Sequence, residues 1–218
     1  MRAVIFANGE LREPEAALAA LEPDDRLIAA DGGMRHLRAL GLTPAWIIGD
    51  LDSLPATDLE RLESGGIEVL RFPERKDQTD LELAMQHAVK LGADEIVVFG
   101  AFGARWDHTL ANLLLSLHPG MLGVQCRFVD GGQRVFPARG LTHIEGTPGD
   151  VVSLIPVGGD ALGVTTSGLE YPLHDGRLSL GSTLGVSNVL VRPPATLEVR
   201  QGQLLVIVSH DGNYGGGR

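Results

Sequence analysis

The sequence contains a single cysteine, Cys126, among 218 residues. An intrachain disulfide is therefore excluded, and the composition fits a reducing compartment. The chain also lacks any stretch close to the roughly twenty uninterrupted apolar residues that a membrane-spanning helix requires. The apolar run after Met1 ends at Asn8 and Gly9, which is too early for a secretory signal peptide. These absences predict a cytoplasmic protein with no membrane partner.

Positive charge is scarce in this chain. Lys and Arg together number 18 against 28 Asp and Glu, which gives a formal net charge of -10. Such a protein repels nucleic acid unless a local basic stripe overrides the total, and the sequence has no such stripe. The overall field would repel a phosphorylated ligand as well, so a nucleotide site needs a cation or focused local donors. We therefore expect small-molecule substrates and no nucleic-acid partner.

Several catalytic motifs are missing. The sequence has no Gly-x-x-x-x-Gly-Lys-Ser/Thr phosphate loop, and the glycines near Gly100 lack the spacing of a dinucleotide fingerprint. The histidines lack zinc-site spacing. Ser53, Ser167 and Ser187 lack the sequence context of a nucleophile elbow. Classical P-loop, dinucleotide, zinc and serine-nucleophile chemistries are therefore not predicted.

Hydrophobic patterning divides the chain into two parts. Through residues 1–124, short apolar runs alternate with helix-period segments, which is the pattern of an α/β domain with a mostly parallel sheet. From 125 to 210 the pattern changes to short strands separated by Gly and Pro turns, which is typical of an all-β sandwich domain. Residues 211–218 are rich in glycine and are expected to form a flexible tail.

The first part contains five predicted strands and two well-marked helices. The strands are expected at 3–6, 26–30, 45–48, 68–70 and 96–99. Thr79 and Glu82 have capping-box spacing at the start of a helix that we expect to end at Gly92. Its apolar stripe consists of Leu81, Ala84, Met85, Ala88 and Leu91. The other helix is expected to begin near Asp107 and to bury Leu110, Leu113, Leu114 and Leu117.

Carboxylates gather where predicted strands end. Asp50 and Asp52 directly follow the apolar run 46–48, and open α/β sheets bind ligands at the carboxyl ends of their strands. Residues two apart in an extended chain share a face, so both side chains are expected to converge on one cation. Asp77 and Asp80 flank the start of the capped helix. Four such carboxylates suit Mg²⁺, which usually takes one or two of them with waters and phosphate oxygens.

An alternative role exists for each of these aspartates. Aspartate is also a common turn and helix-cap residue, which explains any one of the four without a metal. Four like charges crowded together without a cation would, however, cost stability. The metal interpretation is therefore favoured for the set.

Two further clusters contain groups that suit phosphate. In Asp31-Gly32-Gly33, between a predicted strand and helix, glycine lets backbone approach a ligand, although a glycine turn with Asp31 as N-cap explains the same residues. Arg105, His108 and Asn112 are three and four apart and therefore share a helical face. Arginine suits bidentate contact with phosphate. The simpler interpretation is a surface ion pair between Arg105 and Asp107.

Six motifs, taken in order, resemble those of the thiamine pyrophosphokinase family. They are Ala30-Asp31-Gly32-Gly33, residues 48–53, residues 76–80, the Gly-x-x-Gly-x-Arg-x-Asp-His-x-x-x-Asn motif at 100–112, residues 167–173, and Gly185-Val186-Ser187-Asn188. The resemblance spans nearly the whole chain and implies an enzyme that transfers the terminal diphosphate of ATP to thiamine, giving thiamine diphosphate and AMP. It also implies a homodimer with thiamine bound between the subunits.

The resemblance assigns roles to particular residues. It places the Mg²⁺ and phosphate centre at Asp50, Asp52, Asp77 and Asp80. Our hypothesis for the catalytic set is that Asp52 and Asp77 hold the metal, Arg105 neutralises phosphate and Asp80 accepts the hydroxyl proton. The residues expected to bind nucleotide or thiamine are Asp31, Gly32, Gly33, Lys76, Gln78, Thr79, Arg105, Asp107, His108, Asn112, Ser187 and Asn188.

Within this set, Gln78 is expected to approach thiamine, and Ser187 and Asn188 to line the thiamine pocket from the partner chain. One departure concerns Gly131-Gly132-Gln133 after Asp130, where the family often has an asparagine. The role of that side chain is therefore open.

Three other functions fit parts of the same pattern. A diphosphokinase for another heterocyclic alcohol, such as a pterin, would share the nucleotide half. A metal-dependent phosphatase is suggested by Asp50-x-Asp52. A nucleotide or thiamine sensor would bind the same ligands without turnover and form no AMP.

Overall fold

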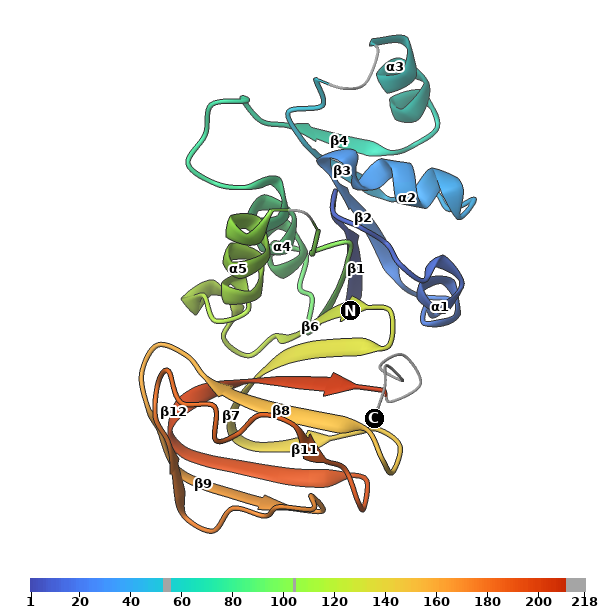
Figure 1. Ribbon diagram of the computed structural model, residues 1–218. Coiled ribbons are helices and arrows are strands. Elements are labelled where there is room, and N and C mark those ends of the chain that lie inside the picture. Colours follow the sequence, from blue (N-terminus) through green and yellow to red (C-terminus); the bar gives the residue numbers. More distant parts are fainter. Residues whose placement is uncertain (53–55, 104, 211–218) are drawn as a thin grey trace. The chain divides into compact units, whose positions relative to one another are not determined.

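The computed structural model describes residues 1–52, 56–103 and 105–210 (Figure 1). The chain forms two compact units, the first being Met1–Gly131 and the second beginning at Gly132. The sequence predicts a division after residue 124. The observed division falls later because strand β6 (Gln125–Asp130) pairs in parallel with β5 (Glu95–Phe99) and belongs to the first sheet. Ser53 and the predicted tail at 211–218 lie outside the described residues.

The first unit is built on a parallel sheet with the order β6-β5-β1-β2-β3-β4. Its remaining strands are β1 (Arg2–Phe6), β2 (Arg26–Ala30), β3 (Trp46–Gly49) and β4 (Glu68–Arg71). The interior strands are apolar because both faces of the sheet are covered. Since all of these strands run in the same direction, their carboxyl ends share one edge. The predicted α/β character of this unit is confirmed.

Helices lie on both sides of this sheet (Figure 1). One face buries Val4 and Phe6 against Ala17 and Leu37, which belong to α1 and α2. The helix α4 contacts β1, β2 and β3 and lies beside α5. The helices are α1 (Pro14–Ala19), α2 (Met34–Ala39), α3 (Ala56–Ser64), α4 (Asp80–Lys90) and α5 (Trp106–Leu115), with 3-10 turns η1 (Asp31–Gly33) and η2 (Pro119–Met121). Within the described ranges, no helix combines the length and apolar character needed to cross a membrane.

Helix α4 begins as its sequence predicts. Thr79 is the N-cap, and its Oγ1 accepts a hydrogen bond of 3.2 Å from the backbone N–H of Glu82. The buried stripe comprises Leu81, Ala84, Met85 and Ala88. Leu91, predicted to continue that stripe, is exposed because the helix ends at Lys90 and Leu91 is its C-cap.

On helix α5, two of the leucines that were predicted to be buried are exposed. Leu110 is 59% exposed and Leu114 is 50% exposed, so the prediction that they are buried is wrong. The buried residues of this part of the chain are instead Asn112 and Ser116. The Asn112 side chain donates a 2.7 Å hydrogen bond to the carbonyl of Ala101, while the predicted Leu113 and Leu117 are half-buried. Helical spacing therefore identified a stripe, but not the side on which it lies.

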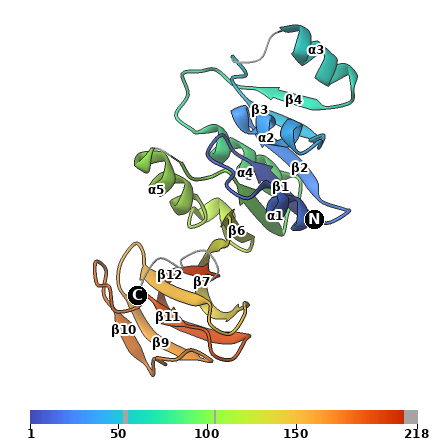
Figure 2. The same ribbon diagram turned by 45° about the vertical axis from the view of Figure 1, so that its right-hand side comes forward.

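The second unit is a sandwich whose two sheets share two long strands. Strands β7 (Gln133–Ile144) and β12 (Ala195–Ser209) pair along their length, with a register shift between Val199 and Leu204. On one side of this shift β12 pairs with β9 (Ala161–Ser167), and on the other with β8 (Val151–Pro156). Two short strands extend the sheets, β10 (Gly176–Leu178) beside β9 (Figure 2) and β11 (Asn188–Val189) beside β8. The predicted all-β sandwich is confirmed.

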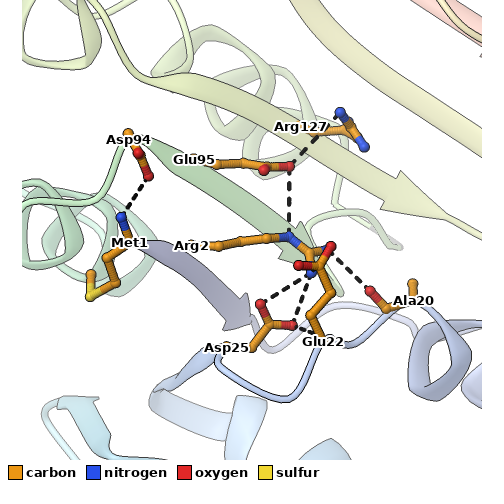
Figure 3. Close-up of polar contacts among 8 residues, drawn as sticks. All are labelled: Met1, Arg2, Ala20, Glu22, Asp25, Asp94, Glu95 and Arg127. Carbon is orange, nitrogen blue, oxygen red and sulfur yellow. Dashed lines mark hydrogen bonds and ion pairs between the residues drawn. The ribbon is translucent and has the colours of Figure 1, made fainter.

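The amino-terminal edge of the first sheet carries a charge network centred on Arg2 (Figure 3). The guanidinium donates to both carboxylate oxygens of Asp25 at 3.1 and 3.0 Å and to the carbonyl of Ala20 at 3.1 Å. Glu22 lies 3.1 Å from it and Glu95 3.6 Å from it. The side chains of Arg2 and Asp25 are only 15% and 3% exposed. This network lies at the strand edge opposite the carboxyl ends and has a structural role.

We expect Arg2→Met to lower the free energy of unfolding by about 3 kcal/mol, because it leaves the buried Asp25 carboxylate without its charged partner. Urea unfolding measures this change. Arg26→Met, at an exposed position on neighbouring β2, is the matched control and should stay within about 0.5 kcal/mol of the parent protein. Equal effects of the two substitutions would contradict the role given to Arg2.

A half-buried histidine on α4 makes stability depend on pH. The ring of His87 packs edge-on against Trp46 with centroids 5.6 Å apart, and its Nε2 is buried without a hydrogen-bond partner. Burial lowers the pKa of His87 below its ordinary 6.5, against a smaller raising effect of Glu68. Burial likewise lowers the pKa of His36. In both cases the unfolded state takes up the proton first as pH falls.

The contribution of these two histidines to the free energy of unfolding is therefore fully present above about pH 6.5. It is lost as the pH falls through their lowered pKa values. We expect the urea midpoint to decrease on acidification through this range. His87→Phe should make the decrease shallower, whereas His174→Phe at an exposed position should leave it unchanged. The same slope in both variants would exclude His87 as a source.

Candidate active site

A cleft of about 430 Å³ opens at the carboxyl edge of the first sheet. Its walls come from the turn after β1, the end of β2, the start of α4, the loop after β5 and the start of α5. This is the location at which open parallel sheets bind ligands. The lining residues are Ala7, Asn8, Gly9, Ala30, Asp31, Thr79, Asp80, Leu81, Gly100, Ala101, Phe102, Gly103, Arg105, His108, Thr109 and Asn112.

Two loops of the cleft are paired through their backbones. The N–H of Gly9 donates to the carbonyl of Gly100 at 2.7 Å, and the N–H of Glu10 donates to that of Phe102 at 2.7 Å. A Cβ on Gly9 would lie 2.1 Å from the Phe102 oxygen, so this close approach requires glycine. The pairing of β1 with β5 thus continues past the strands into the cleft wall.

Asp31 occupies a strained and partly buried position. Its φ of +46° lies in the left-handed region, which is uncommon for a residue other than glycine. Its Oδ1 is buried and has no hydrogen-bond partner. Burial raises the pKa of Asp31, and the neighbouring charges of Asp80, Asp50 and Asp52 raise it further, while a backbone hydrogen bond from Gly32 lowers it. Aspartates from three separate segments therefore lie close enough to influence one another.

Asp80 enters the cleft at the first residue of α4. The ammonium nitrogen of Lys76 lies 2.9 Å from its Oδ1 as an ion pair, and both side chains are largely buried. The geometry of this contact is not that of a hydrogen bond, so the buried Oδ1 still lacks a hydrogen-bond partner. Asp31 Oδ1 is thus buried without a hydrogen-bond partner, whereas Asp80 Oδ1 has the Lys76 ammonium beside it as an ion pair.

The segment holding Asp50 and Asp52 is a turn. Leu51 has a φ of +58°, and the N–H of Asp52 donates to Oδ1 of Asp50 at 3.2 Å. The segment is therefore not the extended chain that the prediction assumed, while the convergence of the two side chains on one cation stays a prediction. Asp52 is exposed, Asp50 is half-buried, and neither lines the cleft.

Of the remaining residues in the predicted motif at 76–80, one lines the cleft and two do not. Thr79 lines the cleft, whereas Asp77 is exposed and does not. Gln78 donates from its side chain to Glu82 Oε1 at 3.1 Å, also outside the cleft lining. Across 1–52, 56–103 and 105–210, no group of three or more His, Cys, Asp or Glu side chains is arranged to share a metal ion.

The structure brings Arg105, His108 and Asn112 to the same cleft. Arg105 also forms the predicted alternative, a two-point ion pair with Asp107 at 2.6 and 3.2 Å, in which both side chains are exposed. Hydrogen bonding to Arg105 lowers the pKa of Asp107 to about 2. Asn112, through its hydrogen bond to Ala101, supports the loop after β5.

The glycines after Asp31 serve the packing of the chain itself. A Cβ on Gly33 would lie 1.8 Å from the carbonyl oxygen of Phe6, and one on Gly32 would lie 2.3 Å from Oδ1 of Asn8. The close approach predicted here is therefore made to the turn after β1. The alternative role of Asp31 as a side-chain N-cap is not observed, since no capping hydrogen bond forms at η1 or α2.

Sequence reasoning missed the turn after β1 as part of the site. Asn8, Gly9 and Phe102 line the cleft but are absent from the predicted set. Their position in the sequence could have identified them, because Asn8 and Gly9 follow the first apolar strand just as Asp31 and Asp50 follow later strands. Applying the strand-end rule to every strand would have included them.

Ser187 and Asn188 belong to the second unit. Ser187 has a φ of +61°, and its N–H donates to Ser153 Oγ at 3.1 Å. The Asn188 side chain donates to the carbonyl of Tyr171 at 2.7 Å and accepts from the N–H of Tyr171 at 3.0 Å. Asn188 therefore fixes the segment around Tyr171. At the departure after Asp130, Gln133 begins β7 and donates to Ser209 Oγ at 3.2 Å.

Comparison with known proteins gives two family matches. The thiamin pyrophosphokinase catalytic domain matches residues 19–127, and the thiamin pyrophosphokinase vitamin B1 binding domain matches residues 141–204. The chain is 32% identical over 186 residues to thiamine pyrophosphokinase of Bacillus subtilis, covering 84% of this chain and 87% of that protein. It is 28% identical over 169 residues to thiamine pyrophosphokinase 1 of Arabidopsis thaliana, covering 71% of this chain and 61% of that protein.

Solved structures agree with these matches. The crystal structure of thiamine pyrophosphokinase from Bacillus subtilis superposes with a TM-score of 0.85 at 29% identity, covering 97% of this chain and 100% of that one. The yeast thiamin pyrophosphokinase structure has the same fold, with a TM-score of 0.75 at 17% identity over 95% of this chain and 86% of that one. From the two domain matches and the Bacillus relative, we conclude that the chain belongs to the thiamin pyrophosphokinase family.

Proposed function

We propose that this chain transfers the terminal diphosphate of ATP to the hydroxyl of thiamine and releases thiamine diphosphate and AMP. The observation that carries the proposal is the cleft at the carboxyl edge of the first sheet, in a chain that matches both family domains. Asp31 and Asp80 line this cleft together with Arg105 and His108. Such a set provides both acidic metal ligands and a cationic phosphate ligand.

We further propose Mg²⁺ as the cofactor, because the acidic groups of the cleft fit it. The Oδ1 atoms of Asp31 and Asp80 are buried without hydrogen bonds, and the two charges act on each other. Mg²⁺ uses one or two carboxylates together with waters and phosphate oxygens. We propose that Asp80 and Asp31 would hold the ion, with Asp50, Asp52 and Asp77 completing the acidic surroundings. When bound, it would supply positive charge that stabilises the polyphosphate.

The protein's own groups account for the remaining steps. Arg105 is held by an exposed carboxylate and is free to exchange that partner for a phosphate oxygen, which binds arginine in the same two-point geometry. Lys76, already directed at Asp80, adds a point charge beside the phosphates. An aspartate of the cleft accepts the hydroxyl proton. We assign this role to Asp80. Asp31, whose own pKa is raised, is a second acceptor.

We also propose that the enzyme acts as a cytoplasmic homodimer, with Ser187 and Asn188 of the second copy lining the thiamine pocket. The support for the dimer is the family resemblance. The support for the compartment is the single cysteine, whose thiol is buried and has a pKa raised by burial to about 11.

The decisive experiment is incubation with ATP, magnesium and thiamine, followed by separation of AMP from ADP. AMP in equal amount with thiamine diphosphate is the expected result. ADP would instead indicate transfer of a single phosphate, and free phosphate without an acceptor product would indicate a phosphatase. Ligand binding with no nucleotide product would indicate a sensor. A parallel incubation with a pterin alcohol tests the acceptor.

A further inference from the structure

The turn after β1 forms one wall of the cleft and is clamped from its other side by α2. The guanidinium of Arg35 donates from Nη2 to the carbonyls of both Asn8 and Gly9, each at 2.8 Å. The ring Nε2 of His36 lies 2.8 Å from the same Gly9 oxygen. Neither Arg35 nor His36 lines the cleft, and neither belongs to the predicted site.

These contacts complete the hydrogen bonding of the turn. The N–H groups of Gly9 and Glu10 donate to the loop after β5, while the carbonyls of Asn8 and Gly9 accept from α2. Both peptide units of the turn therefore have partners for every backbone polar group. A turn fixed in this way is a rigid wall of the cleft.

His36 links the two loops as well as binding one of them. In the tautomer with hydrogen on Nε2, His36 donates to the Gly9 carbonyl, and in the other tautomer the same atom accepts from Arg35 Nε at 3.4 Å. The same ring lies beside Gly100, where an added Cβ would come within 3.6 Å of its Cδ2 atom. The ring thus contacts both sides of the paired segment, the turn after β1 and the loop after β5.

We propose that Arg35 and His36 are positioning residues for the nucleotide, which hold the turn at 7–10 in the place that ATP binding requires. This inference rests on the proposed function, since ATP is the ligand. The two residues act through the turn, so their loss weakens nucleotide binding more than it slows the transfer step. Binding of thiamine is not affected.

The test compares Arg35→Ala, Arg35→Lys and His36→Phe with a matched control, Arg26→Ala, which removes an exposed arginine at the opposite strand edge. Equilibrium affinity for ATP with magnesium is measured without thiamine, so that no turnover is involved. Loss of the charged hydrogen bonds of Arg35 should weaken ATP binding about tenfold. Lysine, which keeps the charge but has a shorter side chain ending in a single ammonium group, should recover part of that loss, and His36→Phe should cause a smaller loss than Arg35→Ala.

Two further readouts separate positioning from general destabilisation. Hydrogen exchange of the Gly9 and Glu10 amides should accelerate in Arg35→Ala, while the KM for thiamine and kcat at saturating ATP stay within about twofold of the parent. Unchanged ATP affinity, or a fall in kcat without a rise in the KM for ATP, overturns the inference. A parent enzyme that binds ATP but forms no AMP refutes the proposed reaction alone, whereas one that binds no ATP refutes both.

Discussion

Asp80→Asn should lower kcat about a thousandfold while leaving the fold intact, which is the loss expected when a charged group that stabilises the transition state is removed. Asparagine has the same shape as aspartate but has lost the negative charge and the ability to accept a proton. Asp80 lines the cleft, and its buried Oδ1 is without a hydrogen bond. Steady-state assays of AMP formation measure the effect, and circular dichroism checks the fold.

The matched control for this substitution is Asp24→Asn, at an exposed position of the same unit and away from the cleft. Its kcat should stay within about twofold of the parent value, because surface substitutions outside a site have small effects. If Asp80→Asn retained near-normal turnover, Asp80 would have neither the metal nor the proton role.

Asp31→Asn should have two effects of opposite sign. Activity should fall about a hundredfold, since a carboxylate of the proposed metal site is lost. The melting temperature should rise by about 2–4 °C at neutral pH. The reason is that the raised pKa of Asp31 means the ionised carboxylate is disfavoured in the folded state, by burial and then by Asp80, Asp50 and Asp52. Asparagine tolerates the positive φ of this position.

Asp175→Asn is a close control for backbone effects. Asp175 also has a positive φ, of +49°, but it lies in the second unit and pairs with Arg200. This substitution should not raise the melting temperature and should not alter turnover. A decrease in stability for Asp31→Asn would show that the aspartate is there to support the fold.

The sequence predicted most of the first sheet because strong local patterns agree with the tertiary structure. The apolar runs at β1, β2, β3 and β5 became buried strands, and Thr79 became the N-cap of α4. The carboxyl ends of parallel strands share one edge, and the structure brings the predicted residues Asp31, Asp80 and Arg105 to one cleft there although they are distant in sequence. Asp50 and Asp52, to which the strand-end rule was applied, do not line that cleft.

The sequence-based predictions failed at positions where the local geometry is irregular but the residue type gives no sign of it. Leu51 adopts a positive φ, although leucine does not favour that region, so the segment from Asp50 to Asp52 is a turn and not the extended chain that was expected. On α5 a polar residue, Asn112, is buried and bonds to the carbonyl of Ala101, which hydrophobic spacing does not predict. The clamp formed by Arg35 and His36 was not predictable, because its partners are backbone carbonyls that any sequence provides.

Strained residues nevertheless coincide with the motifs. Among the described residues, four other than glycine have a positive φ; Asp31, Leu51 and Ser187 lie within segments that resemble the family, and Asp175 does not. Such conformations cost energy and persist where the surrounding structure holds them, often at functional sites.

The central claim is that separate aspartates, gathered at one edge of a parallel sheet, use a divalent ion to bind a polyphosphate to a protein of net charge -10. It is tested most directly by calorimetric titration of ATP into the parent protein, with magnesium and then with a chelator in its place. We predict binding that weakens by about a hundredfold or more when magnesium is withheld. Equal affinity under the two conditions would contradict the claim.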